Sequence, residues 1–129
     1  LKIIGGSTWG ILLLPEGPPH EAYSWQSQES IFNVLANVGI IDTKIIDLFA
    51  GTGAMGLEAL SRGASSSVFI DQATRRILLE NIRRTHNEGR CSVIGSDKYC
   101  RNYAIIILPF LKPIIIVMTL FKYRQYFPR

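Results

Sequence analysis

Short apolar runs recur along the middle of the chain and again near its end. The runs at 45–49, 67–70 and 91–95 lack the strict alternation of polar and apolar residues that marks a half-exposed strand. Near-continuous apolar runs of this length predict parallel strands that are covered on both faces. Two later runs, at 103–108 and 114–120, are still more apolar and predict further strands of the same sheet.

Helix-type segments fill the gaps between these runs. Residues 54–62 and 74–86 show helical spacing of apolar positions, and Leu78 and Ile82 mark the buried stripe of the second segment. A further helix is expected near 29–38, ahead of the first strand. Strands alternating with helices predict an α/β fold with a mainly parallel, Rossmann-like sheet.

The length of 129 residues suits one domain with a modest core. We expect an N-terminal arm and helix at 1–42, followed by the α/β domain at 43–129. The arm contains the Gly- and Pro-rich stretch 15–19 and has no helical pattern before residue 29.

The strongest functional signal is a glycine motif between the first strand and the next helix. Gly51, Gly53 and Gly56 form a G-x-G-x-x-G pattern directly after the apolar run 45–49. Glycines allow a tight turn and a close backbone approach to a ligand. The helix N-terminus that follows offers free N–H groups and the positive end of a dipole. A nucleotide-like ligand is therefore expected here.

Acidic residues follow the next two strands. Asp71 comes at the end of the second strand, about 20 residues after Gly51, where a carboxylate can accept hydrogen bonds from both ribose hydroxyls. Gln72 is the adjacent candidate. Asp97 follows the third strand and could accept a hydrogen bond from an exocyclic amine such as the adenine N6. Three strand ends are thus expected to converge on one crevice.

Asp47, four positions before Gly51, distinguishes between two classes of nucleotide. A carboxylate at this position would repel the pyrophosphate of a dinucleotide, as in an NAD-dependent oxidoreductase. Beside the sulfonium or the α-amino group of S-adenosylmethionine (SAM) it would be favourable. The sequence therefore favours SAM over NAD.

Three segments resemble one family. Residues 47–64 read DLFAGTGAMGLEALSRGA, residues 2–6 read KIIGG, and residues 29–35 read ESIFNVL. In order and spacing they are similar to the RsmD-like family of small-subunit ribosomal RNA guanine-N2 methyltransferases. The similarity extends from residue 1 to about residue 110.

This resemblance implies a class I SAM-dependent methyltransferase that modifies a guanine amine of small-subunit (16S) rRNA. Asp47, Gly51 and Gly53 would hold the methionine part of SAM, Asp71 the ribose and Asp97 the adenine. The complete set of cofactor-binding candidates is Asp47, Phe49, Gly51, Thr52, Gly53, Gly56, Asp71, Gln72 and Asp97.

The chain departs from the family at the catalytic motif. The family has Asp-Pro-Pro-Tyr or Asp-Pro-Pro-Phe after its fourth strand, where the Asp orients the target amine. Pro109 and Phe110 match the second half of that motif, but Ile107 and Leu108 stand where the Asp and the first Pro are expected. Isoleucine cannot accept a hydrogen bond. Two interpretations stay open: an active enzyme, or a catalytically inactive SAM-binding remnant.

Two more departures concern RNA binding and length. Glu21, Gln26 and Gln28 stand where the family carries arginines, which would neutralise RNA phosphates. The segment after Phe110 looks unlike the family's continuation. We expect a sheet that is incomplete at its C-terminal side, from a truncated or frameshifted gene.

Composition adds weaker constraints. The formal net charge of +4 is compatible with RNA, and the arginines of 74–86 are interpreted as a solvated helix face rather than a phosphate patch. The two cysteines and two histidines have no metal-ligand spacing, which favours a reduced, cytoplasmic protein without a metal. A membrane span over 104–121 is disfavoured by Lys112 between two prolines. We expect a monomer.

Overall fold

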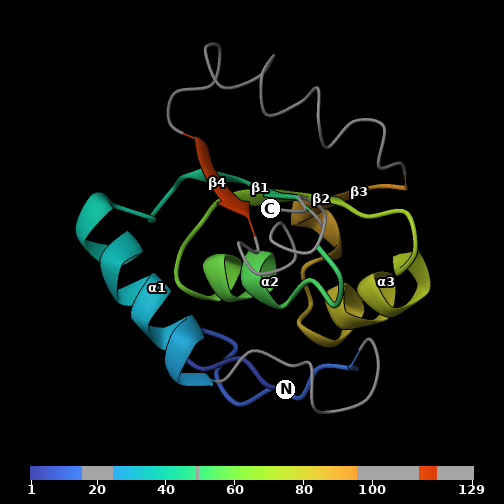
Figure 1. Ribbon diagram of the computed structural model, residues 1–129, viewed down its shortest axis with the longest axis horizontal. Helices are drawn as coiled ribbons and strands as arrows, with labels where there is room; N and C mark the ends of the chain where they lie inside the picture. Colours follow the sequence, from blue (N-terminus) through green and yellow to red (C-terminus); the bar gives the residue numbers. More distant parts are fainter. Residues whose placement is uncertain (16–24, 49, 96–113, 119–129) are drawn as a thin grey trace, which may run out of the picture.

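The computed structural model describes residues 1–15, 25–48, 50–95 and 114–118. Figure 1 shows a sheet with two helices packed on one face and the N-terminal arm beyond them. In chain order the elements are α1 (Trp25–Val38), β1 (Lys44–Leu48), α2 (Ala54–Ser61), β2 (Ser66–Ile70), α3 (Arg75–Arg84), the short 3-10 helix η2 (Glu88–Arg90), β3 (Cys91–Ile94) and β4 (Ile114–Met118).

The predicted elements are confirmed, with small shifts at their ends. The helix expected near 29–38 begins four residues earlier, at Trp25, and α3 ends at Arg84 rather than at residue 86. The strand expected at 114–120 is β4. The run 103–108 lies outside the described residues.

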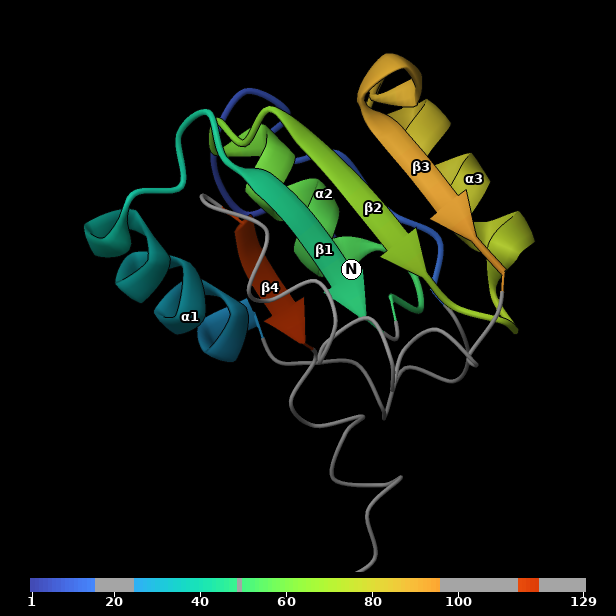
Figure 2. The same cartoon turned by 90° about the horizontal axis from the view of Figure 1, so that it is seen from above.

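All four described strands are parallel, in the order β3-β2-β1-β4. From β1 the chain builds outward through β2 to β3, and β4 then pairs with the other side of β1. Figure 2 shows all four arrowheads pointing the same way. The order of strands therefore reverses between β1 and β4, and open α/β sheets bind ligands outside the carboxyl ends of strands at such a point.

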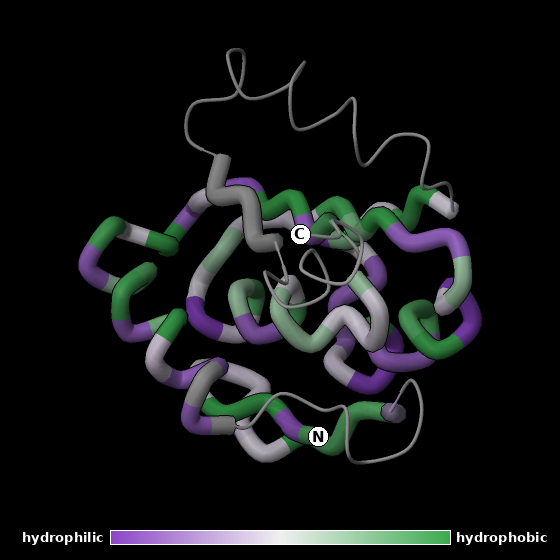
Figure 3. Tube along the Cα trace, in the orientation of Figure 1, coloured by the Kyte–Doolittle hydropathy of each residue, from purple (hydrophilic) through white to green (hydrophobic). Residues whose placement is uncertain are grey.

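Helix α2 is buried on all sides. Seven of its eight residues, from Met55 to Ser61, are buried. It lies between the sheet and the N-terminal arm (Figure 1). Because neither side of the helix faces solvent, its sequence can be mostly apolar. By contrast, α3 has a buried stripe at Leu78, Asn81 and Ile82 and a polar outer face, and Figure 3 shows this helix alternating between hydrophobic and hydrophilic positions.

The N-terminal arm folds back on itself and joins the core. Lys2 and Leu12 form an antiparallel bridge, and the Ile3 N–H donates to the Ile11 carbonyl at 3.0 Å. Ile3 and Leu13 are buried in the same hydrophobic cluster as residues of β1 and α2. The arm therefore contributes to the core that supports α2.

Close helix–sheet packing explains the third glycine of the motif. An added Cβ on Gly56 would lie 2.4 Å from Cε1 of Phe69 and 2.9 Å from Oγ of Ser67. The ring of Phe69 is fully buried and cannot move aside. Gly56 thus serves the packing of α2 on β2.

We predict that Gly56→Ala destabilises the protein by about 1–3 kcal/mol through overpacking, even though alanine favours the helix. Gly89→Ala is the matched control, because nothing lies within 4 Å of an added Cβ there. Its effect should stay within about 0.5 kcal/mol. Equal urea midpoints for the two variants would contradict this packing argument.

Candidate functional site

The glycine loop joins β1 to α2 in a sharp turn. Gly51 and Gly53 have φ values of 58° and 80°, in the left-handed region that L-residues with a side chain rarely adopt. The Gly53 N–H donates to the Ala50 carbonyl at 2.9 Å and closes the turn. The loop's sharpness therefore depends on glycine at both positions.

Asp47 holds the helix end of the loop. Its side chain is fully buried, and Oδ2 accepts a hydrogen bond from the Gly56 N–H at 3.0 Å. Gly56 lies in the first turn of α2, whose N–H groups have no intrahelical partner. The N-cap residue, Gly53, has no side chain to cap them. Asp47 supplies a cap from the neighbouring strand and places a carboxylate at the positive end of the helix dipole.

Asp71 holds the strand end of the loop. Oδ2 accepts from the Gly51 N–H at 2.9 Å and Oδ1 from the Ala73 N–H at 2.8 Å, and the residue is 8% exposed. Each carboxylate oxygen has a second lone pair, so both can accept one more hydrogen bond. That capacity suits a pair of vicinal hydroxyls. Gln72, beside it, is exposed.

The structure brings the central candidates together. Asp47, Gly51, Thr52, Gly53, Gly56 and Asp71 all lie in or directly against the loop at the carboxyl ends of β1 and β2. Phe49 and Asp97 lie outside the described residues, as do Ile107, Leu108, Pro109 and Phe110. Their expected roles stay predictions.

Glu58 supports the structure behind the candidate site, a role that the sequence did not reveal. Its fully buried carboxylate accepts from the N–H groups of Ile4 and Gly5 at 2.8 and 2.9 Å and from Arg62 Nε at 2.8 Å. Gln28 Nε2 of α1 lies 3.4 Å from Oε2. One side chain of α2 thus holds the arm and contacts α1. The available signal was an acidic residue inside an otherwise apolar helix.

This environment corrects the interpretation of position 28 as a phosphate contact. Gln28 is 3% exposed and faces Glu58, not solvent. An arginine there would meet the Glu58 carboxylate instead of RNA. The guanidinium of Arg62, which pairs with Glu58, also lies 5.0 Å from the ring centre of Phe32 on α1.

Gly5 and Gly6 of the arm fit against the C-terminal end of α2. Gly6 has a φ of 81°, and an added Cβ would lie 1.9 Å from the Ser61 carbonyl oxygen. The Ser61 hydroxyl donates to the Gly5 carbonyl at 2.5 Å and accepts from the Thr8 N–H at 3.0 Å. The KIIGG segment therefore has a structural function, which is to seat the arm on α2.

The arginines on the outer face of α3 are partly neutralised. Glu80 pairs with Arg83 at 2.5 Å and with Arg84 at 3.4 Å, and hydrogen bonding to Arg83 lowers the pKa of Glu80 to about 2. A shallow groove of about 440 Å³ beside it is lined by Leu14, Arg76, Leu79, Glu80 and Arg83. Because Glu80 stays ionised in this groove, the surface matches the expected solvated helix face better than a phosphate patch.

Other candidate chemistry is limited in the described part of the chain. Burial raises the pKa of the Cys91 thiol to about 12, so it stays protonated and is a poor nucleophile. Among the described residues, no group of three His, Cys, Asp or Glu side chains could hold a metal ion. Within the same residues, no helix has the length and apolar character needed to cross a bilayer.

Comparison with known proteins places the chain in a family. Residues 1–103 match the model of the family described as Conserved hypothetical protein 95. The chain belongs to this family. Ribosomal RNA small subunit methyltransferase D of Escherichia coli strain K12 is 39% identical over 100 residues, which cover 75% of this chain and 50% of that protein. The chain thus spans about half the length of the curated relatives it matches. The family resemblance of residues 2–6, 29–35 and 47–64 is confirmed.

Solved structures agree with this assignment. The Escherichia coli protein yhhF superposes with a TM-score of 0.63 at 39% identity, covering 75% of this chain and 54% of that one. A hypothetical protein of Thermus thermophilus superposes with a TM-score of 0.67 at 27% identity, covering 81% and 61%. The Rossmann-like methyltransferase fold of this family member is therefore shared with these structures.

We predict that Glu58→Gln lowers the free energy of unfolding by about 3 kcal/mol, because one carboxylate oxygen becomes a donor that faces other donors and Arg62 loses its buried partner. Thermal unfolding measures the loss. Glu80→Gln is the control, since its ion pairs are exposed to solvent and it should change the midpoint far less. A Glu58→Gln midpoint as close to wild type as that of Glu80→Gln would show that Glu58 does not hold the arm.

Proposed function

We propose that this protein binds SAM at the carboxyl ends of β1 and β2 and methylates a guanine N2 amine of small-subunit rRNA. The observation that carries the proposal is the glycine loop. It lies at the reversal point of a parallel sheet, with a carboxylate from each adjacent strand, Asp47 and Asp71, hydrogen-bonded to its backbone.

The donor and acceptor groups of this loop match those of SAM. The negative charge of Asp47 favours a cationic ligand and disfavours a pyrophosphate. The unused lone pairs of Asp71 suit the ribose hydroxyls, and the backbone of Gly51 to Gly53 leaves room for the methionine part. When bound, SAM supplies an electrophilic methyl group. The protein would contribute by holding this methyl group in position relative to the target amine.

The names of the relatives support the proposed substrate. Escherichia coli methyltransferase D is named for small-subunit ribosomal RNA, and this chain is 39% identical to it over the shared region. Ribosomal RNA is found in the cytoplasm, which is where we place the reaction. We also propose that the protein acts as a monomer and without a metal.

A second candidate function is SAM binding without methyl transfer. The observation that favours it is Ile107, which stands where the family has the Asp that orients the amine, and Leu108, which replaces the first Pro. Neither side chain can accept the hydrogen bond that aligns the amine. The two candidates share one cofactor site and differ in whether the product forms.

Asp71→Asn is expected to weaken SAM binding by roughly 10- to 100-fold, the factor for one lost charge-assisted hydrogen bond. Calorimetric titration measures the dissociation constant. Asp42→Asn is the matched control, because Asp42 is exposed, precedes β1 and has a left-handed φ of 61° that asparagine accepts. Equal SAM affinity in the two variants would show that Asp71 does not contact SAM.

Restoring the motif tests the choice between the two candidates. The proposed function predicts that the wild-type chain transfers a methyl group from radiolabelled SAM to small-subunit rRNA. The second candidate predicts no transfer by the wild type and measurable transfer by Ile107→Asp with Leu108→Pro. Ile106→Asp is a control that adds the same charge one position away. Robust transfer by the wild type would show that Ile107 does not prevent catalysis.

A further inference from the structure

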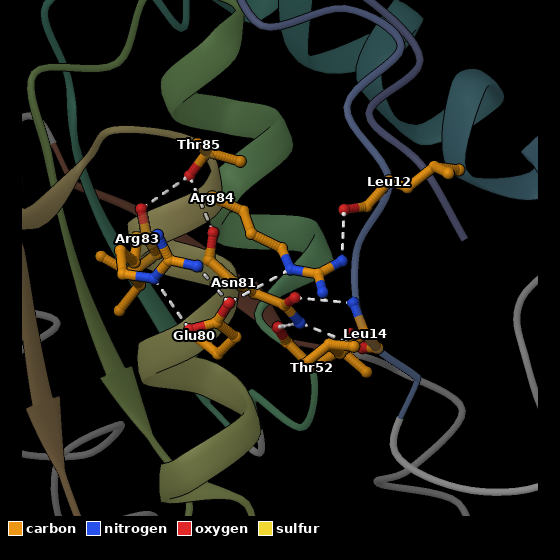
Figure 4. A network of polar contacts seen from close by, with 9 residues as sticks. Leu12, Leu14, Thr52, Glu80, Asn81, Arg83, Arg84 and Thr85 are labelled. Carbon is orange, nitrogen blue, oxygen red and sulfur yellow. Dashed lines mark hydrogen bonds and ion pairs between the residues drawn. The ribbon is translucent and has the colours of Figure 1, made fainter.

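A buried amide connects α3 to both the glycine loop and the N-terminal arm. Asn81 has no exposed surface. Its Oδ1 accepts from the Leu14 N–H at 2.7 Å, and its Nδ2 donates to the carbonyls of Leu14 at 3.0 Å and Thr52 at 2.9 Å. Figure 4 shows the side chain lying between the two segments.

The chemistry of the amide fits these three partners in one orientation only. A carboxamide has two N–H donors and one oxygen acceptor, and here both donors meet carbonyls while the oxygen meets an N–H. Turning the amide over would place its NH₂ group against the Leu14 N–H and its oxygen against two carbonyls. A carboxylate or a methyl group at this position would leave both carbonyls without their donor.

The hydrogen bond from Asn81 to the Thr52 carbonyl supports the middle of the glycine loop. Thr52 lies between Gly51 and Gly53, the two residues with left-handed backbone. Asp71 and Asp47 hold N–H groups at Gly51 and Gly56, so they restrain the two ends. Asn81 holds the carbonyl between them. The loop is therefore restrained by Asp47 of β1, by Asp71 directly after β2 and by Asn81 of α3.

The contact with Leu14 seats the arm. Both backbone groups of Leu14 pair with the same side chain, in the manner of one residue of a strand ladder. At the other end of the arm, Glu58 holds Ile4 and Gly5. Of these two anchors, Asn81 is the one that also touches the glycine loop.

We propose that Asn81 is a positioning residue of the cofactor site, which sets the glycine loop for SAM through Thr52 and couples SAM binding to the docking of the arm at Leu14. The proposal rests on the proposed function for its ligand. A loop that is already restrained loses less conformational entropy when the ligand binds, so removal of the restraint lowers affinity.

Asn87 provides a control of matched chemistry. It is 1% exposed, its Nδ2 donates to the Thr85 hydroxyl at 3.0 Å, and its Oδ1 accepts from Arg90. It lies just beyond the same helix, and these partners belong to neither the loop nor the arm. Its partner Thr85 contacts only the backbone carbonyl of Asn81 in that residue. Asn87→Ala therefore removes a buried amide while the side-chain hydrogen bonds of Asn81 to Leu14 and Thr52 stay in place.

The first experiment compares SAM binding by Asn81→Ala, Asn87→Ala and the wild type, by calorimetry at a temperature where thermal melts show all three folded. We expect about a tenfold loss of affinity in Asn81→Ala, the factor for one ordinary hydrogen bond, and less than about a twofold change in Asn87→Ala. Equal SAM affinities of Asn81→Ala and Asn87→Ala, with both variants folded, would overturn the positioning role of Asn81.

The second experiment tests the coupling by amide hydrogen exchange at Leu14. In the wild type, SAM should slow exchange of the Leu14 N–H, and in Asn81→Ala it should not. A SAM effect that persists in Asn81→Ala would overturn the coupling. If the wild type binds no SAM, the proposed function fails instead. In that case the amide NMR chemical shifts of Gly51 and Gly53 test whether Asn81 restrains the loop. We expect these shifts to change in Asn81→Ala but not in Asn87→Ala. Unchanged shifts in Asn81→Ala would contradict the restraint.

Discussion

The buried carboxylate of Glu58 is the interaction on which the rest of the structure depends. It lies in the middle of α2 and accepts hydrogen bonds from two backbone N–H groups of the arm and from Arg62. Such a group is costly to remove from water, and only several well-placed donors offset that cost. The arm supplies two of these donors. Undocking of the arm would therefore remove two hydrogen bonds from the buried Glu58 carboxylate.

Several features follow from this anchor. Because the arm covers α2, this helix can be apolar on its outer side as well. Its inner side packs closely on the sheet, where Gly56 lies against Phe69. A fixed α2 in turn fixes the start of the helix, where the glycine loop ends. Asp47, Asp71 and Asn81 then restrain that loop from three sides. The backbone of the loop is thus held in place by hydrogen bonds from residues around it.

Much of the fold could be predicted from the sequence because its signals are local. Apolar runs indicated the parallel strands β1 to β4, and the glycine spacing located the loop between β1 and α2. Asp47 and Asp71 could be placed beside the glycine loop, since the carboxyl ends of adjacent parallel strands meet at one edge.

The rest could not be predicted because it depends on long-range pairing. Glu58 and Asn81 find partners more than 50 residues away along the chain. In the sequence Glu58 is a polar residue within the apolar pattern of α2, and Asn81 lies on the buried stripe of α3 beside Leu78 and Ile82. Nothing local identifies the partner of either residue. Gly56 was interpreted as serving a ligand, whereas its neighbours are Phe69 and Ser67. The spacing of a motif does not tell which surface a glycine faces.

If the glycine loop binds SAM, discrimination between SAM and NAD shows it most directly. The measurement is a calorimetric titration of the folded wild-type chain with SAM and, in parallel, with NAD. We expect saturable binding of SAM and no measurable binding of NAD, because Asp47 places negative charge where a pyrophosphate would lie. Binding of NAD in preference to SAM, or binding of neither by a folded chain, would contradict this expectation.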